Sequence, residues 1–243
     1  MSGIYDSIFV RKSVRKFKKE NLSSEQQAAI LDFAEKTTPL YPEIKTKVKI
    51  VSPSEINTLM AVKAPHYLLI FSEKKEGDLL NAGFVLQQID LYLSSQGIGS
   101  CWLGVSKPKV TTFDGFEFVI MLAIGASQEP IYRESISDFN RKPLDEISQG
   151  EDIRLEAARL APSARNGQPW FFVCEDGIIK IYKKKPGGLL NAVFDRLTQI
   201  DIGIAMSHLM LASEKNGIAF SFDDNRGELP AKADYVPIGV VKG

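Results

Sequence analysis

The 243-residue chain is long enough to bury a substantial core as one large domain or two small ones. Hydrophobic residues make up 44% of it and charged residues 25%, which excludes a disordered chain and predicts a globular one. Its 30 Lys and Arg residues balance 30 Asp and Glu residues, so no overall field draws it to nucleic acid or to a membrane. We expect neither as a partner, which leaves room for a local positive pocket.

The lack of recognisable targeting and metal-binding patterns predicts a cytoplasmic protein without a bound metal. The longest apolar run, 118–126, is too short to span a bilayer, which takes about 20 residues. The first residues lack the basic start and apolar stretch of a signal peptide. The cysteines, Cys101 and Cys174, have no CxxC spacing, and the histidines, His66 and His208, are expected to be structural. Any chemistry is therefore expected to depend on a cofactor.

The first half of the chain predicts two helices and three strands. Ser23 and Gln26 have the spacing of a capping box, which begins a helix that ends near Lys36. Asp78 is expected to cap a long helix whose apolar residues recur every three or four positions, and Gly97 ends it. The strands are expected at 48–51, 67–71 and 116–124.

From residue 151 the same kinds of element begin again. A helix is expected at 153–160, followed by strands at 170–173 and 178–182 that a turn at 175–177 joins as a hairpin. A second long helix is expected at 200–216 and ends at Gly217. Two more strands are expected at 218–222 and 235–241.

The two halves, about 1–150 and 151–243, align weakly at a constant offset of 120 residues. The matched pairs include Leu40 and Leu160, Pro42 and Pro162, Gly83 and Gly203, Leu86 and Met206, and Gly97 and Gly217. Helical periodicity by itself produces some of these matches. Two glycines and a proline that recur at the same offset nevertheless favour a divergent internal repeat.

Four cations and one hydroxyl lie within seven residues near the N-terminus, at Arg11, Lys12, Ser13, Arg15 and Lys16. Guanidinium groups bind phosphate through paired hydrogen bonds, and the serine hydroxyl is a further donor. The segment 11–17, called the basic arm below, is therefore a candidate phosphate site. A solvated basic segment is the alternative that the charges alone favour.

A loop rich in small and amide residues, 161–170, connects a predicted helix end to a predicted strand. Its backbone can approach a flat ligand closely, and Ser163, Asn166 and Gln168 offer hydrogen-bonding groups. We call it the Pro-Ser loop. A simple connecting turn beside a buried Trp170 is the alternative.

Two further segments, 97–104 and 140–147, read GIGSCWLG and NRKPLDEI. The first is not a dinucleotide-binding fingerprint, because Trp102 stands where the third glycine is needed and the glycines follow a helix instead of opening one. The chain also contains no P-loop sequence.

Together, RKSVRKF (11–17), GIGSCWLG, NRKPLDEI and APSARNGQPW (161–170) resemble the nitroreductase family of FMN enzymes, including its flavin-reductase and dehalogenase-like members. The resemblance spans most of the chain. It implies an α+β fold with a mostly antiparallel sheet flanked by the two long helices. It also implies one FMN per chain, with NAD(P)H as a transient electron donor and a nitroaromatic, quinone or similar small molecule as acceptor.

By this resemblance the flavin carries the chemistry, and no catalytic acid or base is identified. Arg11, Ser13 and Arg141 would bind the FMN phosphate, and Arg15 would lie near the pyrimidine edge of the ring. The other expected contacts are Lys12 of the basic arm, Trp102, Leu103 and Gly104 beside the flavin N5, and Pro162, Ser163, Ala164, Asn166 and Gln168 of the Pro-Ser loop.

The order of these segments departs from ordinary family members, in which the Pro-Ser loop comes early and two identical chains share the flavin. Here the early position, 41–47, has lost the loop, and the second half has no Arg-x-Ser-x-Arg segment. We interpret 1–243 as one nitroreductase-like unit of two intertwined half-repeats, a monomer that acts as a fused pseudo-dimer. The alternatives are a flavin carrier or sensor without turnover, a degrading or dehalogenating enzyme, and an α/β domain whose repeat is coincidental.

Overall fold

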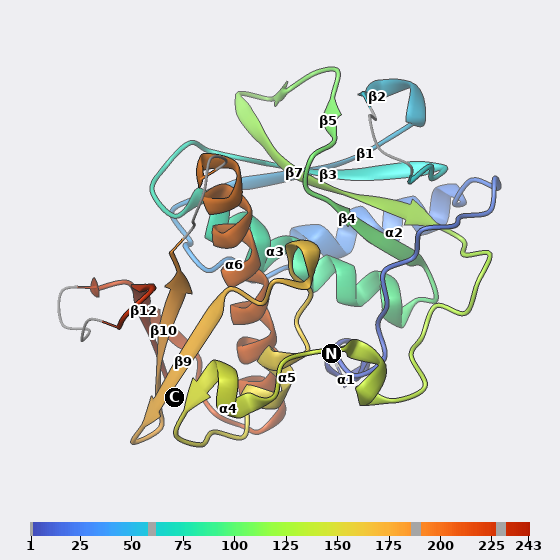
Figure 1. Ribbon diagram of the computed structural model, residues 1–243. Helices are drawn as coiled ribbons and strands as arrows, with labels where there is room; N and C mark the ends of the chain where they lie inside the picture. The colour runs from blue at the N-terminus through green and yellow to red at the C-terminus, as the bar shows by residue number, and fades with distance from the viewer. Residues whose placement is uncertain (1, 58–61, 186–190, 227–231) are drawn as a thin grey trace.

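Two long helices, α3 (Asp78–Ser95) and α6 (Asn191–Lys215), cross at the centre of the molecule, each packed against one of two β-sheets (Figure 1). The computed structural model describes residues 2–57, 62–185, 191–226 and 232–243. No helix in these ranges combines the length and the apolarity needed to cross a membrane. The protein is an α+β fold in which antiparallel pairing predominates, as predicted.

The first sheet pairs β1 (Thr46–Val51), β3 (His66–Ser72), β7 (Phe116–Gly125) and β4 (Gly99–Leu103) in that order, with the short β6 (Thr112–Phe113) also on β7. Every pairing in it is antiparallel. β3 buries both of its faces, which explains its unbroken apolar sequence. Leu68 and Ile70 face the large core with α3, whereas Tyr67, Leu69 and Phe71 face a smaller core on the other side.

The second sheet pairs β9 (Trp170–Glu175), β10 (Ile178–Lys184), β12 (Tyr235–Lys242) and β11 (Ser221–Asp223) in the same order, with β8 (Ser148–Gln149) parallel to β9. In each half, two antiparallel strands are followed by a long helix and then by two more strands. The second of these later strands pairs with the second of the earlier two, and the first lies outside it. The sequence β1-β3-α3-β4-β7 has the same topology as β9-β10-α6-β11-β12.

The shorter elements connect these two layers. They are the helices α1 (Ser2–Ser7), α2 (Ser24–Glu35), α4 (Leu144–Ile147) and α5 (Leu155–Arg159), the 3₁₀ turns η1 (Pro53–Glu55), η2 (Ile136–Phe139) and η3 (Ala164–Asn166), and the two-residue strands β2 (Ile56–Asn57) and β5 (Lys107–Pro108).

Two glycines allow the central helices to approach one another closely. A Cβ atom on Gly83 would lie 2.3 Å from the carbonyl oxygen of Ile200, and a Cβ atom on Gly203 would lie 2.1 Å from that of Leu80. The contact is reciprocal at the offset of 120, because Leu80 corresponds to Ile200 and Gly83 to Gly203. Only glycine has the space to occupy either position.

Most predicted elements are present with bounds shifted by one to three residues, and the capping box of Ser23 and Gln26 is confirmed. Three expectations were wrong in detail. Gly77, at φ 89°, is the residue that precedes α3, so Asp78 lies in the first turn instead of capping it. The helix expected from 200 begins at Asn191, and the strand expected at 218–222 is β11, at 221–223.

Candidate functional site

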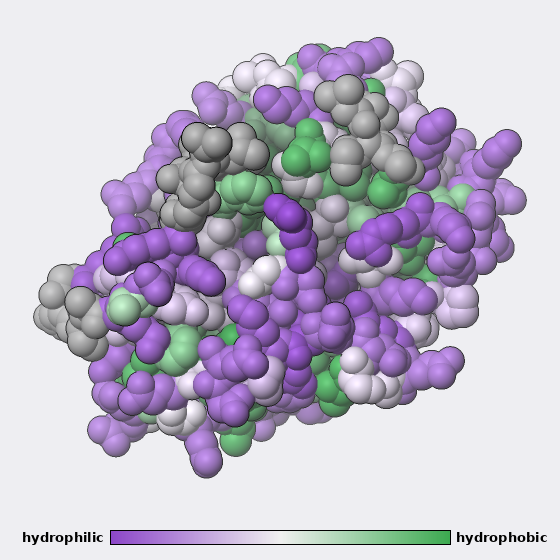
Figure 2. Space-filling model, in the orientation of Figure 1, coloured by the Kyte–Doolittle hydropathy of each residue, from purple (hydrophilic) through white to green (hydrophobic). Residues whose placement is uncertain are grey.

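A cavity of about 780 Å³ lies where three segments far apart in the sequence converge. The basic arm forms one wall, residues 130–141 form another, and the Pro-Ser loop closes the third side. Hydrophilic residues dominate the face of the molecule that carries these segments (Figure 2). Of the thirteen residues that the sequence nominates, eight line this cavity: Arg11, Lys12, Ser13, Arg15, Arg141, Pro162, Ser163 and Asn166.

Arg11 forms a buried ion pair with an acidic residue of α3, Asp90. Its Nε lies 3.0 Å from Asp90 Oδ2 as an ion pair whose side chains are 1% and 0% exposed. The Arg11 Nη2 donates a hydrogen bond of 3.3 Å to Ser13 Oγ. The alternative of a solvated segment is therefore wrong for Arg11, whereas Arg15 and Lys16 are exposed.

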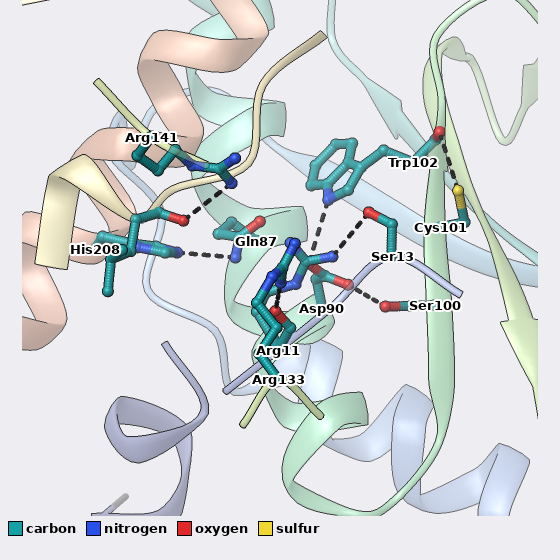
Figure 3. Close-up of polar contacts among 11 residues, drawn as sticks. Arg11, Ser13, Gln87, Asp90, Ser100, Cys101, Trp102, Arg133, Arg141 and His208 are labelled. Carbon is teal, nitrogen blue, oxygen red and sulfur yellow. Dashed lines mark hydrogen bonds and ion pairs between the residues drawn. The ribbon is translucent and has the colours of Figure 1, made fainter. Parts of the chain in front are cut away.

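Asp90 connects the basic arm to strand β4 (Figure 3). Its carboxylate accepts hydrogen bonds from Ser100 Oγ and, at 3.3 Å, from Trp102 Nε1. The backbone N–H of Val14 donates to the Ser100 carbonyl at 2.8 Å, which fixes the arm against the strand. One buried carboxylate thus positions both the phosphate-binding candidate Arg11 and the nominated Trp102.

Arg141 ties the Pro-Ser loop to the segment before α4. Its Nη1 donates to the Phe139 carbonyl at 3.0 Å and to Asn166 Oδ1, and its Nη2 donates to the Leu160 carbonyl at 3.2 Å. Its Nε is buried without a partner. Burial, reinforced by Arg11, lowers the pKa of Arg141 to about 9. The side chain therefore has a donor left over and an excess of positive charge around it.

Arg133, which the sequence interpretation missed, also belongs to this wall. It donates from Nη1 to the Arg11 carbonyl and from Nε to the Asp138 carbonyl at 3.2 Å, and its guanidinium lies 4.1 Å from the centre of the Phe139 ring. Burial and the neighbouring Arg11 lower its pKa to about 10. No motif surrounds it in the sequence, so only the fold reveals it.

The Pro-Ser loop is held in shape by its own polar groups. The Gln168 backbone N–H donates to Ser163 Oγ at 2.9 Å, and the Gln168 side chain accepts from Lys142 N at 2.8 Å and donates to the Asn166 carbonyl at 3.1 Å. Arg165, Asn166 and Gln168 adopt positive φ angles of 56°, 57° and 47°. Gln168 is buried, so in this structure its amide supports the loop and does not line the cavity.

The nominated residues at the end of β4 and directly after it, 102–104, lie behind the cavity instead of lining it. Trp102 contacts Asp90, and Leu103 is buried in the smaller core. Gly104 faces α6, where a Cβ would lie 2.9 Å from Leu197 Cδ2, and borders a second hollow of about 600 Å³ with Arg196. Ala164 likewise does not line the cavity, since its backbone N–H points at Asp201.

Both histidines are structural, as predicted. His66 accepts a hydrogen bond from Leu22 N at 3.2 Å. His208 is fully buried, 2.7 Å from the Ala157 carbonyl through Nδ1 and 3.0 Å from Gln87 Nε2 through its own Nε2. Burial lowers the pKa of His208 to about 3, so the ring is neutral, with its proton on Nδ1 and its Nε2 accepting from Gln87.

The cavity carries a strong excess of positive charge. Two carboxylates line it, Glu134 and Asp138, and the latter already accepts two backbone N–H groups, at 3.1 and 3.0 Å. The cations that face them are Arg11, Lys12, Arg15, Arg133, Arg141 and Arg165. Such a wall, with a buried guanidinium N–H left unpaired, suits an anion with several oxygens, and a phosphate group is the best match.

The protein thus has an α+β fold of two mostly antiparallel sheets around crossed helices, with a cationic cavity between segments that are distant in sequence. The family model described as "Putative TM nitroreductase" matches residues 3–213. The chain therefore belongs to the nitroreductase family, which places it among oxidoreductases.

One solved structure supports the fold at a TM-score above 0.5, and two others match with lower scores. A putative nitroreductase from Thermotoga maritima MSB8 is 21% identical, with a TM-score of 0.63, and the match covers 97% of this chain and 93% of that one. A nitroreductase family protein from Clostridium difficile 630 is 17% identical, with 62% and 98% covered and a TM-score of 0.49. A nitroreductase with bound FMN from Bacteroides fragilis NCTC 9343 is 13% identical, with 51% and 89% covered and a TM-score of 0.42. No curated protein matches the chain.

Proposed function

We propose that this cavity binds the phosphate end of one FMN and that the protein passes electrons from NAD(P)H to nitroaromatics, quinones or similar small acceptors. One observation carries the proposal. The basic arm and the Pro-Ser loop, about 150 residues apart in sequence, line the same cationic cavity. Family membership supports the same function.

The residues present fit a flavin phosphate. Arg11, Ser13 and Arg141 would bind it, and the unpaired Nε of Arg141 would gain a partner. Burial, and to a lesser extent the neighbouring arginines, lower the pKa values of Arg133 and Arg141, and a dianion would offset both effects. Lys12 and Arg15 would add positive charge at the rim, where an exposed cation stabilises a reduced, anionic ring.

The remaining nominated residues would shape the ring site. Pro162 and Ser163 would cover the ring, with Ala164 anchored to α6 and the loop held in place by Asn166 and Gln168, while Trp102, Leu103 and Gly104, which do not line the cavity, would support the opposite side from behind. Bound FMN would supply two-electron transfer between a reduced nicotinamide and the acceptor. The chain itself would bind, orient and partly enclose it, and solvent would exchange the protons.

We infer one FMN per chain, with the two halves acting as a fused pseudo-dimer. The shared strand order and the reciprocal glycine crossing support this interpretation. At the offset of 120, Ala161 of the Pro-Ser loop corresponds to Tyr41 and Trp102 corresponds to Phe222. Tyr41 packs edge-on against Phe222, with ring centroids 5.8 Å apart. In this interpretation, large side chains would fill the counterpart of the flavin site in the other half.

The test is flavin stoichiometry in the purified protein together with a charge-matched pair of variants. The protein should be yellow and hold about one FMN after reconstitution. Arg11→Ala with Arg141→Ala should weaken FMN binding by 100-fold or more, because each charge-assisted hydrogen bond contributes roughly 1.5–3 kcal/mol. Lys36→Ala with Lys180→Ala removes the same charge from exposed pairs and should bind FMN normally.

Two results would count against the proposal. Negligible flavin after reconstitution with excess FMN would reject the cofactor, and two FMN per chain would reject the pseudo-dimer with one site. Anaerobic addition of NADPH or NADH should bleach the bound flavin, and a nitroaromatic or quinone should restore its colour. A protein that keeps its FMN but is never reduced would instead be a carrier or sensor.

A further inference from the structure

Asp201, in the third turn of α6, lies directly beneath the Pro-Ser loop. Both oxygens of its carboxyl group accept the backbone N–H of Ala164, at 3.0 and 3.1 Å. The side chain is 5% exposed, and this N–H is the one donor to it among the described residues. A buried carboxyl with a single backbone partner is costly to ionise.

The other half of the molecule has an amide at the equivalent position. At the offset of 120, Asp201 corresponds to Asn81 of α3. Asn81 Oδ1 accepts from Leu40 N at 2.8 Å and Tyr41 N at 3.0 Å, and its Nδ2 donates to the Ile44 carbonyl at 3.0 Å. The same helix position therefore holds the equivalent loop in each half, by a neutral amide in one and by an acid in the other.

No counter-ion faces Asp201 within the described residues. Burial therefore raises the pKa of its carboxyl to about 8, and the hydrogen bond from Ala164 offsets this only in part. The charged groups on the elements packed around α6 are engaged elsewhere. Asp78 of α3 pairs with Lys74, Asp195 of α6 with Lys183 of β10, Glu156 with Arg159 of α5, and Arg165 of η3 lies over Phe194, while Asp6 of α1 is exposed.

We propose that Asp201 is a positioning residue for the flavin site, which keeps the Pro-Ser loop in its binding shape as long as its carboxyl retains a proton. The inference rests on the proposed FMN function. Loss of the proton would leave a carboxylate in an apolar interior, and water can reach it only if the loop moves away from α6. The loop that would cover the flavin would then be displaced.

Binding of FMN beneath this loop would exclude more water and favour the protonated carboxyl further. By linkage, FMN affinity must then fall as the pH rises through the pKa of Asp201 in the free protein. For a pKa of about 8 and a bound state that retains the proton, the dissociation constant should increase about tenfold between pH 7 and pH 9.

The experiment compares wild type with Asp201→Asn, which is neutral at every pH and copies the amide of the other half. The dissociation constant for FMN is measured by flavin fluorescence quenching with apoprotein from pH 7 to pH 9.5. Wild type should show the tenfold loss from Asp201, whereas Asp201→Asn should keep only the loss of about twofold at pH 9 that follows from the pKa of about 9 for Arg141. Asn81→Ser, which loosens the equivalent loop of the other half, is the control and should follow wild type.

A second readout needs neither the variant nor FMN. In apoprotein with ¹³C-labelled aspartate carboxyl groups, one resonance should titrate near pH 8. Absence of any aspartate titrating above pH 6 would overturn the proposal, as would parallel affinity profiles for wild type and Asp201→Asn. No FMN binding to wild type at pH 7 would instead reject the proposed function itself, so the two failures are distinguishable.

Discussion

The ion pair of Arg11 and Asp90 offers a strong test of how the cavity is built. In Asp90→Asn the Arg11 guanidinium stays 1% exposed, with its negative partner removed. Breaking a buried pair on one side costs roughly 3–5 kcal/mol, because the surviving charge remains desolvated. We expect a decrease of that size in the free energy of unfolding, measured by urea denaturation followed by far-ultraviolet circular dichroism.

Two comparisons separate this cost from a general effect of charge removal. Asp32→Asn breaks an exposed pair with Lys36, whose side chains are 64% and 66% exposed, and should cost about 0.5 kcal/mol or less. Arg11→Met combined with Asp90→Asn removes both charges, keeps an amide oxygen as acceptor for Ser100 and Trp102, and should recover most of the stability lost in Asp90→Asn. A loss below about 1 kcal/mol in Asp90→Asn, or no recovery in the double variant, would refute the reasoning.

Three further predictions concern the central helices and the buried titratable groups. Gly83→Ala and Gly203→Ala should each destabilise the protein by about 1–3 kcal/mol in thermal unfolding, because their Cβ atoms would lie 2.3 and 2.1 Å from backbone atoms of the other helix. Gly3→Ala is the control and should not change the stability, since its Cβ atom would lie 3.9 Å from the nearest atom. The depressed pKa of His208 means that stability is lost as the pH falls from 6.5 toward 3, by on the order of 4 kcal/mol, and His208→Gln should remove that part of the acid denaturation profile. The raised pKa of Asp201 has the opposite consequence: stability of the apoprotein should fall as the pH rises from about 4 to about 8, and urea unfolding of Asp201→Asn should lack that slope.

Local sequence signals were sufficient to predict an element where residues within that element determine its start or its end. The capping box at Ser23 and the left-handed glycines at 97 and 217 end or begin helices through contacts within a few residues, and all are present. The α6 start was missed because polar residues interrupt the apolar pattern at 195–199, and partners distant in sequence stabilise this part of the helix. Asp195 pairs with Lys183, and Arg196 donates to the Val119 carbonyl at 2.5 Å.

The same limit applies to β4 and to the cavity. The segment 97–104 contains three glycines and looks like a loop, and it becomes a strand through its register with β7, where Gly99 lies opposite Gly125. Neither Asp90 nor Asp201 was among the nominated residues. An ionisable residue within an apolar helical stretch is the signal that could have identified both, since such a residue is buried with a partner or a function.

The convergence of the basic arm and the Pro-Ser loop was predicted from resemblance alone, and its physical cause lies in the helix crossing. Because Gly83 and Gly203 let α3 and α6 approach backbone to backbone, each helix carries its own half's loop into the other half. In a symmetric arrangement this geometry would form two equal cavities. Substitutions at matched positions, Asn81 against Asp201 and Tyr41 against Ala161, act on the loops and leave the crossing intact. If the chain is a fused pseudo-dimer, one flavin site could therefore be lost without loss of the fold, since the residues that define the core differ from those that define the cavities.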